Sequence, residues 1–518
     1  MAATKIKLLY LLTLGWGVIN FWIAPHTPLT DLPQHAGQIA LLNDLLLGQS
    51  KWNGVFSINW LTPYLSTYAL STMLSQLMTI TIAFKLLLSI GYLAFVLMCV
   101  KLRKHFKVDE RLDWLFILPF LGFAFKFGFL SFVLSAPIGL WFILEADKYA
   151  ENTTRASAVK VTAIGLLLLI SHGLMFLFAF SVGFTLLFLR TLKIKYFIVK
   201  ITPYVILLLA FIAIFLVNLQ LNKRLGLAEY SIEASQVGLK TLELIRIPQA
   251  IFYTLAGSKI SVFPLIHIPA TLVLLVAPWL LGLRINLRNI PACAFFIMTT
   301  TVFALVPGYI FGTYFVYQRF SIFIIPSYAL LFTKQISCSP VGKSNSSLIQ
   351  NMTLALLMMA CWSVLAFNSL ATLSFKKEAA DIDQLIASLE PGQKALSLII
   401  DSVSKADNNS LAYAHYPLWY QAEKNGLVYH NFAIYAPMPV RFKPGHMHLG
   451  YERADPTSFD WLKHKGSMYR YFFVRTGIDQ KIPEGWFKNA PCPPKIIVSP
   501  KITSKGQWRV YENVTCAK

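Results

Sequence analysis

The chain has 518 residues, of which 56% are hydrophobic and 14% are charged, and its mean hydropathy is +0.57. Soluble globular proteins carry about 25% charged residues, so this composition excludes an ordinary soluble protein and indicates an integral membrane protein. The net charge of +22 fits basic cytoplasmic loops and contact with anionic membrane lipid. No nucleic-acid-binding module is visible, so nucleic acid is not expected as a partner.

The first apolar segment lies at about residues 8–24 and follows two lysines, which by the positive-inside rule keep the N-terminus in the cytoplasm. It lacks a small-x-small cleavage site and further apolar segments follow it. We therefore expect a retained transmembrane helix rather than a cleaved signal peptide. Residues 25–61 then form an outer loop, which opens with a polar run from Thr30 to His35.

An amphipathic helix is predicted in this outer loop, from about Leu32 to Leu47. Gln34 and Asp44 fall away from its apolar face, which consists of Leu32, Ile39, Leu42 and Leu46. A helix of this kind would lie along the membrane surface.

Further crossings are expected wherever an apolar block reaches roughly 17–25 residues, the length that spans about 30 Å of hydrocarbon. Residues 62–100 are too long for one helix, and we expect a crossing at 82–100 after a tilted, re-entrant or surface-packed segment at 62–80. The block 160–190 is divided into two short crossings by Ser171-His172-Gly173. The other crossings are predicted at about 113–127, 130–146, 197–218, 262–282, 291–309, 319–334 and 348–370.

An odd number of crossings, about eleven, places residues 371–518 outside the cytoplasm. That segment is polar, and it shows a predicted helix at Phe375–Leu389 and predicted strands at Ala395–Ile400 and Tyr469–Val474. We expect a small extracytoplasmic α/β domain. Its two cysteines, Cys492 and Cys516, fit one disulfide in an oxidising compartment, although two free thiols are the alternative.

Asp31 permits two interpretations. It can act as a general base, because inverting glycosyl transfer needs a carboxylate that removes the proton of the acceptor hydroxyl. It can also cap the helix that begins at Leu32-Pro33. His35 follows one helical turn later and could bind a phosphate or orient the acceptor, or it could be a surface histidine without a role.

Polar side chains within or beside apolar segments are costly and tend to be functional. Four stand out, and they are Lys126, His172, His267 and Arg319. Cations at the level of the outer headgroups would suit a lipid-linked phosphate. The alternatives are that Lys126 and Arg319 reach out to the membrane interface and that His172 is a hydrogen-bonded interior histidine.

The sequence contains no Walker A motif, no HExxH and no paired CxxC, so ATP-driven transport and zinc hydrolysis have no support.

The whole pattern resembles the GT-C superfamily of integral-membrane glycosyltransferases. The matching features are Asp31 in the first outer loop, the helix behind it, about eleven crossings, the Gln318-Arg319-Phe320 run at the outer end of a late crossing, and the C-terminal outer domain.

This resemblance implies a polyprenyl-phosphate-linked sugar donor, inversion at the anomeric carbon and no nucleotide sugar. By this resemblance Asp31 would be the base and Arg319 would bind the donor phosphate. We add four candidate substrate-binding residues, which are Gln318, His35, Lys126 and His172. Many members carry two acidic residues in the first loop, whereas Leu32 follows Asp31 here. No metal site or other cofactor is therefore expected, although a metal requirement stays open.

The resulting hypothesis is a glycosyltransferase of the bacterial inner membrane that acts at the outer leaflet on a glycan, lipid or protein acceptor. Residues 1–370 would form the transmembrane catalytic module, with outer loops at 25–61 and 219–261, and residues 371–518 would form the outer domain. The alternatives are a transporter or flippase of lipid-linked glycans, which would show interrupted helices and repeats, and a non-catalytic membrane scaffold.

Overall fold

The computed structural model describes residues 2–191, 194–225, 266–310, 313–334, 343–406, 411–435, 437–446, 456–477, 480–497 and 507–514. Most of the predicted outer loop 219–261 lies outside these ranges, and so does Cys516. The chain divides into two compact units, and the division falls inside three described α-helices and the 3-10 helix η1 (Asn20–Trp22). Unit 1 contains residues 1–21, 86–217 and 229–369, and unit 2 contains residues 22–85, 218–228 and 370–518.

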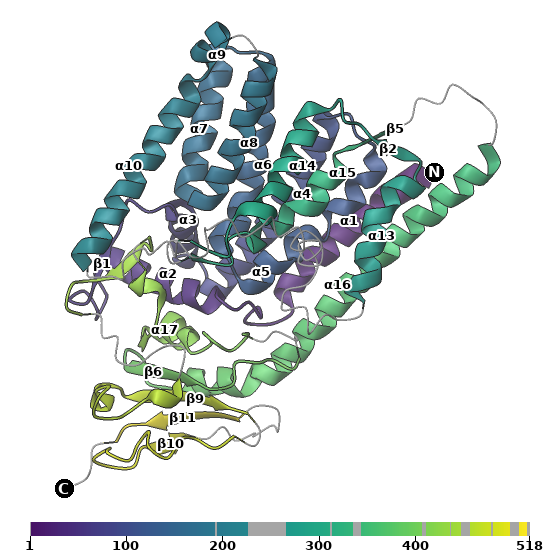
Figure 1. Ribbon diagram of the computed structural model, residues 1–518. Helices are drawn as coiled ribbons and strands as arrows, with labels where there is room; N and C mark the ends of the chain where they lie inside the picture. The colour runs from purple at the N-terminus through teal and green to yellow at the C-terminus, as the bar shows by residue number, and fades with distance from the viewer. Residues whose placement is uncertain are drawn as a thin grey trace. The chain divides into compact units, whose positions relative to one another are not determined.

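Unit 1 is helical (Figure 1). Its helices are α1 (Ala2–Ile19), α4 (Ile80–His105), α5 (Phe123–Phe127), α6 (Leu130–Glu151), α7 (Arg155–Ser171), α8 (Gly173–Arg190), α9 (Ile194–Lys200), α10 (Thr202–Leu225), α13 (His267–Leu280), α14 (Ile290–Leu305), α15 (Ile324–Ala329) and α16 (Lys343–Ser388), of which α4, α10 and α16 continue into unit 2. Three 3-10 helices, η2 (Glu110–Phe116), η3 (Pro119–Leu121) and η5 (Gln318–Phe323), and two small antiparallel pairs complete it. These pairs are β2 (Leu283–Ile285) with β5 (Phe332–Lys334), and β3 (Tyr309–Ile310) with β4 (Thr313–Tyr314).

Five helices among the described residues are long and apolar enough to cross a membrane, namely α4, α6, α8, α10 and α16, and α13 and α14 are shorter apolar helices. The prediction of a helical protein with several membrane-spanning helices is confirmed, whereas the expected number of crossings, about eleven, remains a prediction. The predicted crossing at 348–370 and the predicted helix Phe375–Leu389 prove to be parts of the single helix α16. It ends just before Pro391-Gly392, where proline cannot continue a helix.

The helices α6, α7 and α8 pack side by side (Figure 1). A side chain added at Gly183 would come within 2.9 Å of Phe142 on α6, so glycine allows the two helix backbones to approach closely. The break between α7 and α8 falls at His172, as the sequence predicts, and that residue has extended backbone angles (φ −166°, ψ 117°).

Two predicted crossings are wrong. Residues 113–127 form η2, η3 and α5, and residues 319–334 form η5, α15 and β5, instead of one continuous helix each. In the first segment, Pro119 lacks an amide hydrogen and Gly122 adopts an extended conformation (φ −77°, ψ −153°), so the helical hydrogen bonds are interrupted. Apolar composition alone cannot reveal such interruptions.

Unit 2 combines the predicted outer loop with the C-terminal segment. Its elements are α2 (Leu32–Leu46), β1 (Phe56–Ile58), α3 (Leu65–Ser75), β6 (Lys394–Ile399), α17 (Leu418–Lys424), β7 (Leu427–Tyr429), η6 (Phe432–Ile434), β8 (Val440–Phe442), η7 (Pro456–Ser458), η8 (Gly466–Met468), β9 (Tyr471–Thr476), β10 (Lys495–Ile497) and β11 (Gln507–Glu512). The sheet order is β10-β11-β9-β6-β7, in which β6 runs parallel to both β7 and β9 (Figure 1). The C-terminal segment is thus α/β, with β6 and β9 close to the predicted strands.

Helix α2 begins at Leu32, as predicted, but it is not a half-exposed surface helix. Almost all residues from Leu32 to Leu42 are buried, because α17 and α3 pack against this helix. In addition, β1 pairs with β8. Gln34, which we expected on the polar face, is completely buried. The reason is that the C-terminal segment covers the polar face of α2 with groups that form hydrogen bonds to it.

Candidate functional site

Asp31 occupies the N-cap position of α2, but its side chain makes no capping hydrogen bond. Pro33, at the start of the helix, supplies no amide donor. The carboxylate is instead directed at His415, with its Oδ1 3.4 Å from the imidazole Nε2. Asp31 is 8% exposed. The position therefore has the backbone features of a cap, while its carboxylate faces His415.

His415 lies just before α17 and enters this site from the C-terminal part of the chain. Its Nδ1 lies 3.1 Å from Nε2 of Gln34, and the same amide nitrogen donates to the backbone carbonyl of His430 at 3.0 Å. His415 could not be found by reasoning from sequence, because nothing in its local pattern distinguishes it from the other histidines.

His35 is also part of this cluster. Its Nδ1 lies 2.6 Å from the hydroxyl of Tyr68 on α3, and its ring contacts Phe432 edge to face. Burial raises the pKa of Tyr68 well above its usual value, and the charges of Tyr64 and Asp31 add to this effect. The Tyr68 hydroxyl therefore stays neutral. His35 is buried with it, in contrast to a free surface imidazole.

A second histidine missed by the sequence reading, His26, lies between two carboxylates in unit 2. Its Nδ1 is 3.0 Å from Asp383 and its Nε2 is 2.7 Å from Glu423, while its ring stacks on Trp419 with the centroids 4.1 Å apart. Burial lowers the pKa of His26, but hydrogen bonds to Asp383 and Glu423 outweigh burial and raise it to about 9. The imidazolium thus ties the first outer loop to α16 and α17.

Arg319, the expected phosphate ligand, lies in η5 of unit 1 and is 9% exposed. Its guanidinium carbon is 3.6 Å from the centre of the Phe129 ring, and Nη2 donates to the carbonyl of Tyr314 at 2.9 Å. Phe315 has a left-handed backbone (φ 58°), which is a strained conformation for a bulky residue and typical of functional segments. The neighbouring Gln318 is buried.

Lys126 lies in the last turn of α5, which packs against η5. Phe127 of α5 contacts Phe315 with the ring centroids 4.7 Å apart. The charge of Lys126 also acts on His267, a buried histidine at the start of α13. Unit 1 thus brings two of the predicted cationic residues, Lys126 and Arg319, onto packed neighbouring elements.

His172 is buried, and its Nδ1 accepts a hydrogen bond from the amide of Met175 at 3.5 Å, at the start of α8. Its ring meets Phe132 edge to face. These contacts are those of the interior, hydrogen-bonded histidine that we gave as the alternative, and its role in substrate binding remains a prediction.

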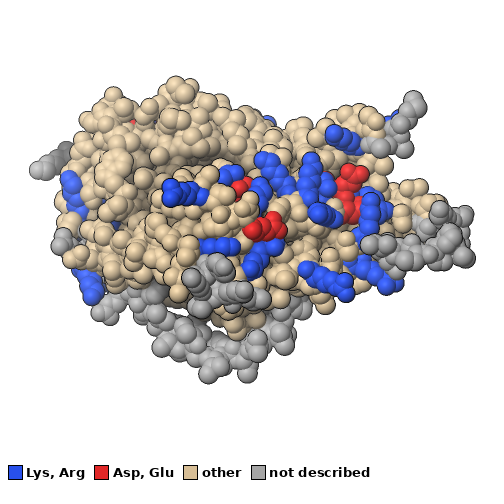
Figure 2. All heavy atoms as spheres, turned by 90° about the horizontal axis from the view of Figure 1, so that it is seen from above, with Lys and Arg blue, Asp and Glu red and all other residues tan. Residues whose placement is uncertain are grey.

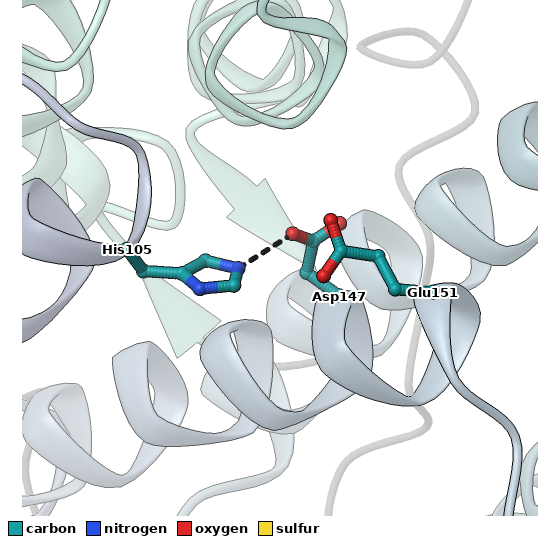
Figure 3. Close-up of side chains that lie close together, drawn as sticks. All are labelled: His105, Asp147 and Glu151. Atoms are coloured by element: carbon teal, nitrogen blue, oxygen red, sulfur yellow. Dashed lines mark hydrogen bonds and ion pairs between the residues drawn. The ribbon is translucent and has the colours of Figure 1, made fainter.

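Lys and Arg gather on one face of the molecule, with few acidic residues among them (Figure 2). The ends of α4 and α6 carry a group of three possible metal ligands, His105, Asp147 and Glu151 (Figure 3). Asp147 is fully buried and accepts from Arg190 at 2.8 Å and from His105 at 2.8 Å, and Arg190 also pairs with Glu151 at 2.9 Å. Because Arg190 already forms ion pairs with both carboxylates, we assign this group a structural role.

Cys492 takes part in a disulfide. Its expected partner, Cys516, lies outside the described residues, so the Cys492–Cys516 pairing remains a prediction.

No protein-family model and no curated protein matches this sequence. Solved structures with a similar fold include ArnT from Cupriavidus metallidurans bound to undecaprenyl phosphate, with a TM-score of 0.56 and 10% sequence identity. They also include the same protein in the apo state, with a TM-score of 0.53 and 12% identity. Both alignments cover 99% of this chain and 99% of ArnT.

Arabinofuranosyltransferase AftD from Mycobacteria aligns over 98% of this chain and 42% of its own, at 12% identity and a TM-score of 0.49. The GT-C fold expected from the sequence is confirmed by ArnT. At these identities the likeness shows the fold alone.

Proposed function

We propose that the protein transfers a sugar from a polyprenyl-phosphate-linked donor to a glycan, lipid or protein acceptor at the outer face of a bacterial inner membrane, with inversion at the anomeric carbon. Two findings support this proposal. The fold is shared over its whole length with ArnT, whose structure was solved with undecaprenyl phosphate. The observation that carries the chemistry is the Asp31 carboxylate, which makes no capping bond and is directed at His415.

In the proposed reaction, Asp31 removes the proton of the acceptor hydroxyl while that oxygen attacks the anomeric carbon of the donor. The bond between this carbon and the phosphate oxygen breaks on the opposite side, and its electron pair leaves with the phosphate. The products are the glycosylated acceptor, polyprenyl phosphate and a protonated Asp31, which returns its proton to water. A positioned carboxylate of this kind contributes about 10²–10⁴-fold to a rate.

Arg319 and Lys126 are the groups we propose for the donor phosphate. Negative charge grows on that phosphate as the bond breaks, and a guanidinium can bind two phosphate oxygens with a fixed geometry. The stacking of Arg319 on Phe129 and its hydrogen bond to Tyr314 hold the guanidinium in place before a ligand arrives. Gln318, His35 and His172 remain candidate substrate-binding residues.

The test of this function is the Asp31→Asn variant of the full-length protein in lipid nanodiscs. A panel of undecaprenyl-phosphate-linked pentoses and hexoses would serve as donors, a membrane lipid and glycan extract as acceptor, and release of undecaprenyl phosphate as the signal. We expect a loss of about 100-fold or more in turnover, because an amide cannot accept the proton.

Asp44→Asn is the matched control, since Asp44 lies on the same helix and the same substitution changes the same charge. It should retain turnover. Full activity in Asp31→Asn, with the protein folded as judged by thermal unfolding, would contradict the proposed base and favour the scaffold or transporter alternatives.

A further inference from the structure

We infer that His415 is a positioning residue for the Asp31 carboxylate, and that Gln34 and the backbone of His430 fix the tautomer in which it acts. This inference rests on the proposed function, because it concerns the same carboxylate. It adds a residue from the C-terminal segment to the proposed site. Gln34 and His415 are 381 positions apart in the sequence.

The backbone carbonyl of His430 determines the orientation of the Gln34 side-chain amide. The carbonyl of His430 can only accept a hydrogen bond, so the atom of Gln34 that lies 3.0 Å from it must be the NH₂ nitrogen. The reverse orientation would bring two carbonyl oxygens together in a fully buried place, which is costly. The amide orientation is therefore determined by the backbone.

The tautomer of His415 follows from that orientation. The second hydrogen of the Gln34 amide is directed at Nδ1 of His415, 3.1 Å away. Nδ1 must accept this hydrogen, so in the neutral imidazole the proton sits on Nε2. Nε2 is the atom that lies 3.4 Å from Oδ1 of Asp31. His415 thus presents an N–H donor to the carboxylate.

The backbone at His430 shows how the protein holds this arrangement. His430 has a left-handed conformation (φ 75°), which a residue with a side chain adopts at a cost of about 1 kcal/mol or more. The residue directly follows β7, so the left-handed turn sets the direction of its carbonyl at the end of a strand. Strain of this kind persists where the surroundings require it.

An N–H donated to this carboxylate has two consequences for Asp31. It favours the ionised form, which is the form that can remove a proton. It also fixes one carboxylate oxygen, and a displacement of about 1 Å in a reacting group can cost about 100-fold in rate. His415 therefore acts through Asp31, in the same way that a third group orients the base in other catalytic arrangements.

The experiment compares His415→Phe and His415→Gln with the wild type, with the same undecaprenyl-phosphate-linked donors and extract. Phe keeps the ring volume and removes both nitrogens, whereas Gln places an N–H near the position of Nε2. We expect His415→Phe to lower kcat by about 10- to 100-fold with the donor KM unchanged, and to move the acid limb of the pH–rate profile to higher pH. His415→Gln should recover most of the kcat and the wild-type pH profile.

Two further variants test the role of the Gln34 amide and control for the loss of a buried histidine. Gln34→Met removes the amide while leaving the imidazole in place, so it should lower kcat in the same direction by about tenfold even if His415→Phe fails to fold. His464→Phe is the control for the loss of a buried histidine in unit 2, because His464 contacts the amide of Asp460 instead, and it should keep the wild-type kcat and pH profile.

The outcomes separate this inference from the proposed function. If Asp31→Asn is inactive while folded His415→Phe and Gln34→Met keep the wild-type kcat and pH profile, the role of His415 is refuted and the proposed function stands. Failure of His415→Gln to recover activity also refutes the hydrogen-bonding role. If Asp31→Asn itself is active, the proposed function fails, whatever the histidine variants show.

Discussion

At the scale of single residues, His26 is a buried group that holds a charge. A buried imidazole ordinarily loses its proton, yet this one is flanked by Asp383 and Glu423 on its two nitrogens. Its partners come from the end of α16 and from α17, so the loop that follows the first helix is attached to the C-terminal segment within unit 2. A charged, doubly hydrogen-bonded histidine is a strong local attachment because both of its N–H groups find charged acceptors.

This attachment predicts a pH-dependent stability. The folded pKa of His26 is about 9, above the usual value of about 6.5, so its contribution is complete below pH 6.5 and is lost as the pH rises through 9. The contribution is about 1–3 kcal/mol. Thermal unfolding of the full-length protein should show a falling midpoint between pH 6.5 and 9.

The matched variant is His26→Gln, which should have a lower midpoint at pH 6 and little change in midpoint across the same pH interval. An equal pH dependence in the wild type and in His26→Gln would show that other groups cause it.

At the scale of elements, the packing of α2 on α17 positions Asp31 and Gln34. Gly37 lies at the crossing, where an added Cβ would come 2.8 Å from Nε2 of Gln421 and 3.2 Å from Leu418. Gln421 cannot easily move, because it is buried and its Oε1 accepts from the amide of Val428 at 3.0 Å. Glycine is therefore needed at position 37 for α2 and α17 to approach each other this closely, although glycine weakens a helix.

We predict that Gly37→Ala destabilises the protein by about 1–3 kcal/mol through overpacking, despite the gain of up to about 1 kcal/mol in helix propensity. Thermal unfolding measures this change. Gly15→Ala is the control, since Gly15 lies within α1 and an added Cβ there meets nothing within 4 Å. If both variants gain stability alike, the close contact at Gly37 is not a constraint.

The elements also show where reasoning from sequence succeeds. The start of α2 at Leu32-Pro33, the break at His172 and the end of α16 before Pro391-Gly392 depend on proline, glycine and polar residues that act on their own backbone, so they could be predicted. The segments 113–127 and 319–334 could not, because an apolar run does not reveal whether its backbone hydrogen bonds are helical or broken into shorter turns.

At the scale of the whole molecule, the number of crossings and their direction remain predictions. The basic residues on one face (Figure 2) favour that face as the cytoplasmic one, by the positive-inside rule. The described residues include five helices that can span a membrane, which is fewer than the eleven crossings expected, partly because two of those expected are not continuous helices.

The orientation can be tested with cysteine substitutions at exposed positions. We predict that a membrane-impermeant maleimide labels Lys463→Cys in intact spheroplasts and labels Lys104→Cys only after permeabilisation, because residues 371–518 should be outside and the C-terminal end of α4 inside. Both side chains are exposed. The wild-type protein gives the background labelling, because Cys293 is half-buried whereas Cys99 and Cys361 are buried. The reverse labelling pattern would contradict the proposed topology.

The sequence by itself determined that this is a helical membrane protein and that a helix begins directly after Asp31. These features follow from hydrophobic length, helix-starting residues and local breaks, all of which act over a few residues. The tertiary structure alone decided that Gln34 is buried, that His415 faces Asp31 and that His26 is held by two carboxylates. Such contacts join positions hundreds of residues apart, and no local pattern encodes which distant groups will meet.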